Sequence, residues 1–380
     1  MTAGRITFPQ RDPTRFIEDL RARVADYFES RRLSPKANAA MIAKTITLLG
    51  LTFGAYGLIL TNRLGPWPML GLAIVVGVGV AGLGFSVAHD ALHGAYSHDA
   101  RVNAALGFVF NLIGANGYIW KITHNVIHHT YTNIPGIDGD LEVSPLVRLS
   151  PHAAWKPIHR WQHLYAIPLY GLSTLFWVFI KDYKYFLKRH LGPYHHKHHS
   201  AGAVATLLGS KALYYGWSIV IPLLVLDVAW WQFVIGYVAM HLTAGLLLGI
   251  VFQLAHSVEG PAFPSPDERG AMEHAWAVHE METTSDFGRH NRLLNWYVGG
   301  LNFQIEHHLF PKVCSIHYPA LSAIVEATAR EHGIVYHEHA TFRAAVRSHY
   351  RMLRRLGRPP EAAPDAPAPP VPGAPAMRPA

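Results

Sequence analysis

The stretch L-N-F-Q-I-E-H-H-L-F-P, residues 301–311, places two adjacent histidines, His307 and His308, in an apolar and aromatic-rich run. If this run is helical, Gln304 lies three and four residues before the two imidazoles, so all three side chains can share one face. A buried pair of imidazoles is costly unless something binds their nitrogen atoms. The stretch therefore raises the question of whether other histidines of the chain converge on it.

The composition is typical of a membrane protein. Half of the 380 residues are hydrophobic and only 15% are charged, whereas a soluble chain needs more charged surface. The chain contains 26 histidines, a net charge of +8 and a single cysteine, Cys314. One cysteine excludes an internal disulfide framework and any multi-cysteine zinc or iron–sulfur site supplied by this chain. Any metal chemistry must therefore rest on imidazole.

Four apolar stretches are long enough to cross a bilayer, namely residues 42–60, 67–88, 201–226 and 230–255. We therefore expect an all-α integral membrane fold with four transmembrane helices, interfacial helices and a cytoplasmic histidine-rich cap. Residues 1–40 have the pattern of a basic amphipathic helix that lies on the cytoplasmic surface of the membrane. Residues 41–357 would form the membrane domain, and the Pro/Ala-rich tail 358–380 would be disordered.

Two shorter apolar stretches, 104–120 and 165–180, are interpreted as interfacial or re-entrant segments. If either of them crossed the membrane, histidine clusters would fall on opposite faces, whereas four spans place all clusters on one face. Lysines and arginines crowd that same face, since the two turns on the other side contain only Arg63. By the positive-inside rule, the histidines and both termini are expected to be cytoplasmic.

Two further histidine clusters lie near the predicted inner ends of the apolar stretches. The first is H-D-A-L-H, with His89 and His93, and the second is H-N-V-I-H-H, with His124, His128 and His129. A spacing of four puts both histidines of a pair on one helical face, while His129 lies about 100° round the helix. Imidazole suits iron, zinc and copper. The three clusters hold seven histidines, which is more than one tetrahedral zinc needs, so two metal ions are favoured.

The clusters resemble the three histidine boxes of the membrane fatty acid desaturase family, which read HxxxH, HxxHH and H/QxxHH. The boxes match in order at His89/His93, His124/His128/His129 and Gln304/His307/His308. The similarity covers residues 42–336 and includes the run H-H-T-Y-T-N that begins at His128. Gln304 in place of a histidine resembles the front-end subgroup of linoleoyl-CoA desaturase-like enzymes. Those enzymes place a double bond between the carboxyl end of the chain and an existing double bond.

The resemblance implies a non-haem di-iron centre whose iron ligands are the seven box histidines. The family usually supplies one further ligand from the inner end of the fourth span, which corresponds here to His256, with Gln253 one turn earlier. His279 in the cap is the alternative, and Gln304 is a further possible ligand. The carboxylates that would orient ligating imidazoles through the second ring nitrogen are Asp90, Asp138 and Asp140.

The activity implied by the resemblance is an O2-dependent desaturation that introduces a cis double bond into an acyl-CoA or an acyl-lipid and produces water. Many relatives carry a fused cytochrome b5 domain with an H-P-G-G motif, which this sequence lacks. We therefore expect a separate ferredoxin- or cytochrome b5-type electron carrier as partner, and no nucleic acid. Two alternatives stay open, namely a sister di-iron oxygenase (a lipid hydroxylase or ketolase) and a membrane metal transporter.

Overall fold

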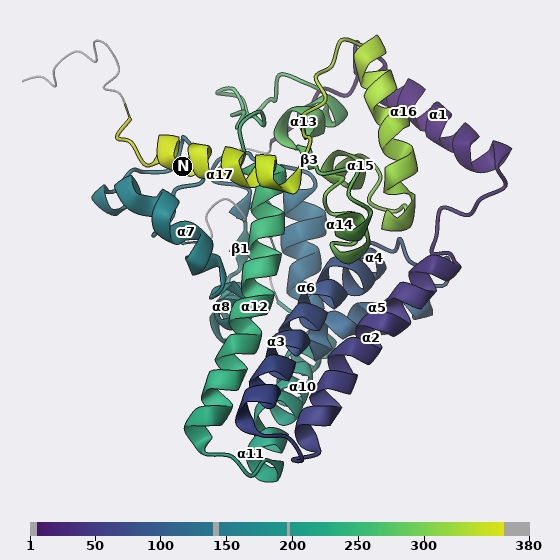
Figure 1. Cartoon of the computed structure of the whole chain (residues 1–380). Helices are drawn as coiled ribbons and strands as arrows, with labels where there is room; N and C mark the ends of the chain where they lie inside the picture. Colours follow the sequence, from purple (N-terminus) through teal and green to yellow (C-terminus); the bar gives the residue numbers. More distant parts are fainter. Residues whose placement is uncertain (1–5, 140–143, 196–197, 361–380) are drawn as a thin grey trace, which may run out of the picture.

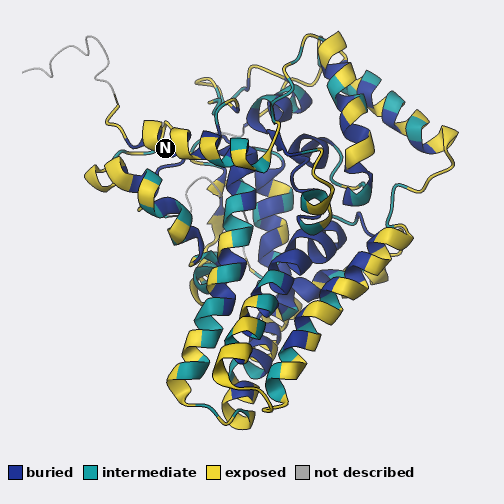
Figure 2. Ribbon diagram, in the orientation of Figure 1, coloured by how far each residue is buried: buried dark blue, intermediate teal, exposed yellow. Residues whose placement is uncertain are grey.

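The computed structural model describes residues 6–139, 144–195 and 198–360 of the chain. Within these residues the fold is almost wholly helical. Long apolar helices form a stem, and shorter helices and loops form a cap at one end of it (Figure 1). Figure 2 shows that buried residues concentrate where the stem meets the cap, while the outer faces of the stem are exposed. A long apolar helix with an exposed apolar face is typical of a membrane protein.

The stem contains four helices that are long and apolar enough to cross a membrane. The first is α2 (Ala39–Leu60), and the second runs from α3 (Pro66–Gly82) through the π-helical η1 (Leu83–Ala88) into α4 (His89–Leu92). The third joins α10 (Ala201–Tyr215), η6 (Gly216–Val220) and α11 (Ile221–Val225), and the fourth is α12 (Trp230–His256). These four candidate spans coincide with the four apolar stretches predicted to cross, with ends that differ by at most four residues.

Two more helical segments are sharply bent. Helix α5 (Ala100–Leu112) meets α6 (Gly117–Trp120) and the π-helical η2 (Lys121–His128) at 110°. The second bend, of 71°, separates η4 (Pro157–Trp161) and α7 (Gln162–Tyr170) from α8 (Ser173–Phe176), η5 (Trp177–Lys181) and α9 (Asp182–Leu187). A break this sharp makes each pair either a broken span or a re-entrant loop. The described residues thus contain four candidate spans, or up to six if each bent pair crosses.

The cap is built from short helices and two small sheets. Its helices are α1 (Phe16–Ser30), α13 (Trp276–Thr283), α14 (Arg292–Tyr297), α15 (Gln304–Leu309), η7 (Ser315–His317), α16 (Tyr318–Glu331) and α17 (Phe342–Leu356). Strands β3 (Asp286–Phe287) and β4 (Glu338–His339) pair in parallel in the cap. Strands β1 (His190–Leu191) and β2 (Tyr194–His195) form an antiparallel hairpin between the bent segment and α10.

The amphipathic helix α1 packs on protein. Its apolar residues Phe16, Leu20, Val24 and Phe28 are buried in one cluster with residues of α13, α15 and α16. The expectation that this face lies on the membrane surface is therefore wrong for the described residues. The reason is physical, because an amphipathic pattern shows that one face is covered but does not show whether lipid or protein covers it.

Two close backbone approaches require glycine. Gly245 of α12 meets the bend between α7 and α8, where a Cβ would lie 2.3 Å from the carbonyl oxygen of Gly171. Gly299 has φ +60°, and a Cβ there would lie 2.5 Å from Ser86 Oγ. Only glycine accepts such contacts without a shift of the backbone. The second contact brings the loop before α15 directly against η1, the segment that leads into His89.

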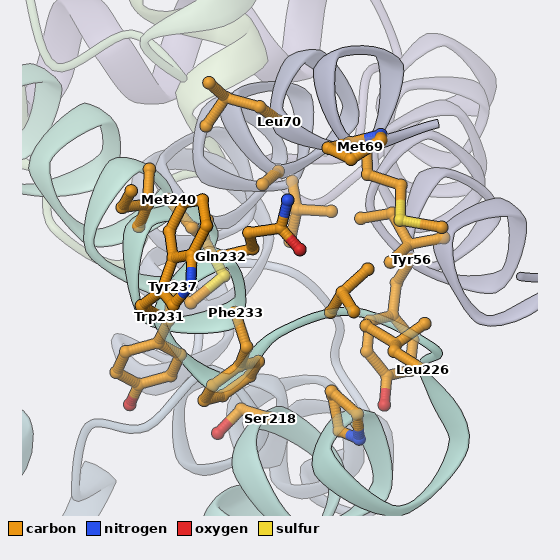
Figure 3. Close-up of a pocket in the computed structure, with 18 of the residues that line it drawn as sticks. Tyr56, Met69, Leu70, Ser218, Leu226, Trp231, Gln232, Phe233, Tyr237 and Met240 are labelled. Carbon is orange, nitrogen blue, oxygen red and sulfur yellow. The ribbon is translucent and has the colours of Figure 1, made fainter. Parts of the chain in front are cut away.

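An apolar cavity of about 420 Å³ lies at the end of the stem opposite the cap. It is enclosed by the beginnings of α3 and α12, the end of α2 and the η6–α11 segment. Figure 3 shows its labelled residues, among them Trp231, Phe233 and Tyr237 of α12. No histidine lines this outer cavity, and of the histidines singled out above, His89, His93 and His256 lie at the other ends of the spans that begin with α3 and α12.

Candidate metal centre

Elements far apart in sequence bring the three histidine boxes together where the stem meets the cap. The first box lies at the end of the span through α3, η1 and α4, the second lies in η2, and the third lies in α15 (Figure 1). Both η1 and η2 are π-helical, a geometry that is rare and frequent at functional sites. Of the π-helical stretches, η1 thus leads directly into the first box and η2 carries the second, while η5 and η6, which are also π-helical, carry no histidine.

The first imidazole group consists of His89, His93, His124 and His307. Each offers one ring nitrogen, and these four atoms lie within 4.8 Å of one another. The ring centroids of His89 and His307 are 4.5 Å apart. Four imidazoles this close, from three separate elements, match the donor set that iron, zinc or copper takes.

The second imidazole group consists of His128, His256 and His308, whose ligand atoms also lie within 4.8 Å of one another. The three side chains are at most 1% exposed. His256 ends α12, so its imidazole joins this group from the fourth candidate span. The described residues therefore contain two neighbouring imidazole groups, one with four members and one with three.

The π-helical geometry of η2 changes which histidines of the second box lie together. The His129 N–H donates to the carbonyl oxygen of His124 over five residues, at 3.0 Å. Their Nε2 atoms are 3.2 Å apart, while His128 joins the other imidazole group. His124 and His128 do lie on one face, as expected, because their rings stack with centroids 5.1 Å apart, but they belong to different imidazole groups. His129 itself lies between the groups, with ring centroids 4.5 Å from His307 and 4.4 Å from His308.

The imidazoles are held in a form that suits metal binding. Burial, followed by the neighbouring imidazoles, lowers the pKa of His93, His129, His307 and His308 well below the ordinary histidine range. A neutral imidazole keeps a nitrogen lone pair for a metal. Within the described residues, His256 Nε2, His307 Nε2 and His308 Nε2 are buried without a hydrogen-bond partner. Such atoms are costly in a protein interior unless a ligand binds them, so the residues fit a metal centre.

Two carboxylates orient imidazoles through the second ring nitrogen. Asp138 Oδ2 lies 2.9 Å from His128 Nδ1, and both side chains are 1% exposed. Glu280 Oε2 lies 2.7 Å from His308 Nδ1, and both side chains are fully buried. Thr132 Oγ1 donates to the same Glu280 oxygen at 2.9 Å. A carboxylate behind a histidine fixes the ring orientation and raises its basicity as a metal ligand.

Glu280 is the functional residue that the sequence analysis missed. It follows His279 in α13, and the run W-A-V-H-E drew attention to the histidine alone. In the structure, His279 Nε2 is 2.9 Å from the carbonyl oxygen of Thr132, and His279 belongs to neither imidazole group. The useful signal was a glutamate between Trp276 and Met281 in an apolar helix, because a buried carboxylate needs a partner.

The other predicted site residues take different places. Asp90 Oδ2 accepts from Ser315 N and Oγ, and its Oδ1 is 3.9 Å from His89 Nδ1, beyond hydrogen-bond distance. Asp140 lies outside the described residues. Gln253 and Gln304 are both buried and line a cavity beside His89 and His124.

This inner cavity, of about 200 Å³, opens from the first imidazole group into the stem. Its wall is mostly apolar and comes from the ends of α3, α5 and α12 and from the two bent segments. Phe252 and Leu248 of α12 and Trp120 of α6 are among its lining residues. The indole of Trp120 stacks on the ring of His124 at 4.3 Å. The arrangement places a mostly apolar space directly beside the first imidazole group.

Comparisons with known proteins agree on one family. The family model described as fatty acid desaturase matches residues 65–340. The chain is 36% identical to a protein of Synechocystis sp. named sn-1 linoleoyl-lipid 6-desaturase, over 94% of this chain and 99% of that protein. It is 35% identical to a protein of the same name from Arthrospira platensis, over 95% of this chain and 97% of that protein. An acyl-lipid (8-3)-desaturase of Physcomitrium patens is 33% identical over 89% of this chain and 71% of that protein.

Proposed function

The chain belongs to the fatty acid desaturase family, and we propose that it is a front-end desaturase acting on an acyl chain esterified to a membrane lipid. As a fatty acid desaturase it is an oxidoreductase of lipid metabolism. The observation that carries the proposal is the pair of buried imidazole groups beside an apolar cavity. Removal of hydrogen from an unactivated methylene needs a strong oxidant, which protein side chains do not supply.

We propose that the two imidazole groups hold two iron ions. His89, His93, His124 and His307 would hold one, and His128, His256 and His308 the other, with His129 between them. When bound, iron supplies the activation of O2 with electrons from outside the chain. Asp138 and Glu280 would orient His128 and His308, and the apolar cavity wall would keep bulk water from the reacting methylenes. We favour His256 over His279 because only His256 belongs to an imidazole group.

The substrate class rests on Gln304 and on the relatives. Gln304 is 3% exposed and shares the inner cavity with His89 and His124, so it lies where an acyl chain would pass the centre. The first two relatives named above are linoleoyl-lipid desaturases, which act on a chain that already carries double bonds. We infer that this enzyme likewise takes an unsaturated acyl-lipid and adds a cis double bond on the carboxyl side of an existing one.

Product analysis tests this proposal. The chain is expressed in a host supplied with defined fatty acids, and the double bonds of the lipid-bound and CoA-bound pools are located by mass spectrometry. We expect a new double bond on the carboxyl side of an existing one, and we expect it to appear first in the lipid-bound pool. Hydroxylated or keto products without a new double bond would identify a sister oxygenase and overturn the proposal.

We propose that the cap, the imidazole groups and both termini are cytoplasmic. The distribution of basic residues supports this orientation, because lysines and arginines concentrate on the cytoplasmic side of membrane proteins. The turn between α2 and α3 and the turn between α11 and α12 hold a single basic residue between them, Arg63. With four spans, the two bent segments are re-entrant and residues 41–357 form one membrane domain. The proposed disordered tail, residues 358–380, falls largely outside the described residues.

Helix α17 is a candidate docking surface for the electron carrier. Its exposed side chains include Arg343, Arg347 and Arg354, and the helix contains no acidic residue. Its buried face lies over the end of α12, since His349 Nδ1 is 2.6 Å from the carbonyl oxygen of Ser257, the residue after His256. We propose that a separate, acidic ferredoxin- or cytochrome b5-type carrier docks on this face.

Reversal of the three exposed arginines of α17 to glutamate tests the docking surface. We expect the rate of reduction by an acidic carrier at low salt to fall by about 10-fold, because opposite charges speed encounter. Stopped-flow reduction of the iron-loaded enzyme provides the measurement, and the difference should shrink at high salt. Arg63→Glu, at the other end of the stem, is the matched control. Unchanged low-salt rates in the triple variant would refute docking at α17.

A further inference from the structure

A buried charged pair, outside both imidazole groups, joins the third candidate span to one of the bent segments. Lys211 of α10 is 3% exposed, and Asp182, the first residue of α9, is fully buried. Lys211 Nζ lies 2.8 Å from Asp182 Oδ2. Ionisable side chains within membrane segments are costly and usually mark a functional place. This pair has no part in the metal chemistry described above, so its position needs another reason.

The pair ties together three separate segments of the stem. Lys211 Nζ also donates to the carbonyl oxygens of Gly114 and Val178, at 2.7 and 2.9 Å. Asp182 Oδ2 accepts the backbone N–H of Asn116 at 2.8 Å. All three ammonium protons thus have acceptors, and the bend of the first broken segment and the η5–α9 part of the second are both fixed against α10. A buried charge pair with every hydrogen bond made sets geometry more than it adds stability.

Trp177 connects this pair to the inner cavity. Its Nε1–H donates to Asp182 Oδ1 at 2.8 Å, and its side chain lines the cavity. A row of aromatic contacts runs from it to the first imidazole group: Trp177 to Phe110 at 5.5 Å, Phe110 to Trp120 at 5.3 Å, and Trp120 to His124 at 4.3 Å. One wall of the cavity is therefore a rigid aromatic row, held at one end by a buried carboxylate and joined at the other to a metal-binding ring.

We propose that Trp177 is a specificity-determining residue and that the Lys211–Asp182 pair is the positioning device that holds its indole, so that together they set which carbons of the acyl chain lie beside the imidazoles. This inference rests on the proposed function. A chain in the inner cavity can slide only as far as the aromatic row allows. The position of the acyl chain relative to the imidazole groups is therefore fixed by the aromatic row as well as by the lipid head group.

Replacement of Trp177 tests the wall. Trp177→Leu opens the cavity at the end away from His124, and Trp177→Phe keeps a ring but loses the N–H that binds Asp182. A hydrophobic pocket wall gives a selectivity of about 10-fold or more between acyl chains that differ by one methylene. We expect Trp177→Leu to lose a selectivity of about this size. Products of Trp177→Leu should carry double bonds at neighbouring positions of the acyl chain, and Trp177→Phe should make a smaller share of such products. Ile180→Ala, on the same segment and 50% exposed, is the matched control.

The ion pair is tested with both partners replaced. Asp182→Asn alone leaves a buried, unpaired lysine and is expected to lower the yield of folded protein. The double variant Asp182→Leu with Lys211→Met removes both charges, keeps similar volume and avoids that defect. We expect it to fold and to bind iron, while its products show the same positional spread as Trp177→Leu. A purely structural role would change yield or stability and leave double-bond position unchanged.

The outcomes separate this inference from the proposed function. If the wild-type enzyme makes no unsaturated product from any supplied chain, the proposed function fails. If the wild-type enzyme desaturates, and Trp177→Leu and the double variant keep its double-bond position and chain-length preference, the inference alone is overturned. Altered positions in both variants, with the wild-type pattern in Ile180→Ala, support the inference.

Discussion

His307→Ala is expected to abolish desaturation while the protein still inserts into membranes. His307 is 1% exposed and belongs to the first imidazole group, so its loss removes one of four donors. Loss of a residue that merely orients a ligand costs 10- to 100-fold, and loss of the ligand itself should exceed about 100-fold. Iron analysis of purified protein should give about two ions for each wild-type chain and about one for the variant.

Insertion should persist because α15 lies in the cap and contributes nothing to the four candidate spans. The matched control is His290→Ala, since His290 is exposed and belongs to neither imidazole group. It should keep both iron content and activity. O2-dependent activity that persists in a fully iron-free preparation would contradict the assignment of the metal centre.

The features that were predictable from sequence are those with a local pattern. The four candidate spans followed from apolar stretches of sufficient length, and the histidine boxes followed from short spacings within single segments. The convergence of His256 on His128 and His308 was also accessible, because His256 ends a span on the face where the boxes were expected. Four predicted crossings put His256 on the same face of the membrane as the boxes, and the chemistry of imidazole favoured a shared metal site there.

What could not be predicted depends on contacts between distant segments or on backbone geometry. Glu280 pairs with His308, 28 residues later in the chain, and no spacing rule links a helix to a box in another part of the cap. The π-helical form of η2, which sorts His124 and His128 into different groups, has no visible sequence signature. Lys211 did carry a signal that was overlooked, because a lysine within an apolar span needs a partner.

Glu280→Gln is expected to lower iron affinity and activity by about 10- to 100-fold, although Gln is nearly the same size as Glu. Glu280 Oε2 meets His308 Nδ1 at 2.7 Å in a fully buried site, where burial raises the pKa of Glu280 well above its ordinary value. With a metal on the opposite ring nitrogen, Nδ1–H would donate to the ionised carboxylate, whose charge makes that nitrogen a stronger donor. An amide can still accept the hydrogen bond but carries no charge, so orientation survives while basicity falls. Iron titration of the purified variant, alongside its rate of desaturation, measures the two effects separately.

The control for this change lies two residues away on the same helix. Glu282 is partly exposed and pairs with His274 Nδ1 at 2.7 Å, so Glu282→Gln removes a carboxylate of α13 without touching an imidazole group. If Glu282→Gln weakens iron binding as much as Glu280→Gln, the effect belongs to the charge of α13 as a whole. If only Glu280→Gln does so, the hydrogen bond to His308 is the cause. That result extends the metal centre beyond its histidines, because part of its affinity then comes from a carboxylate that touches no metal.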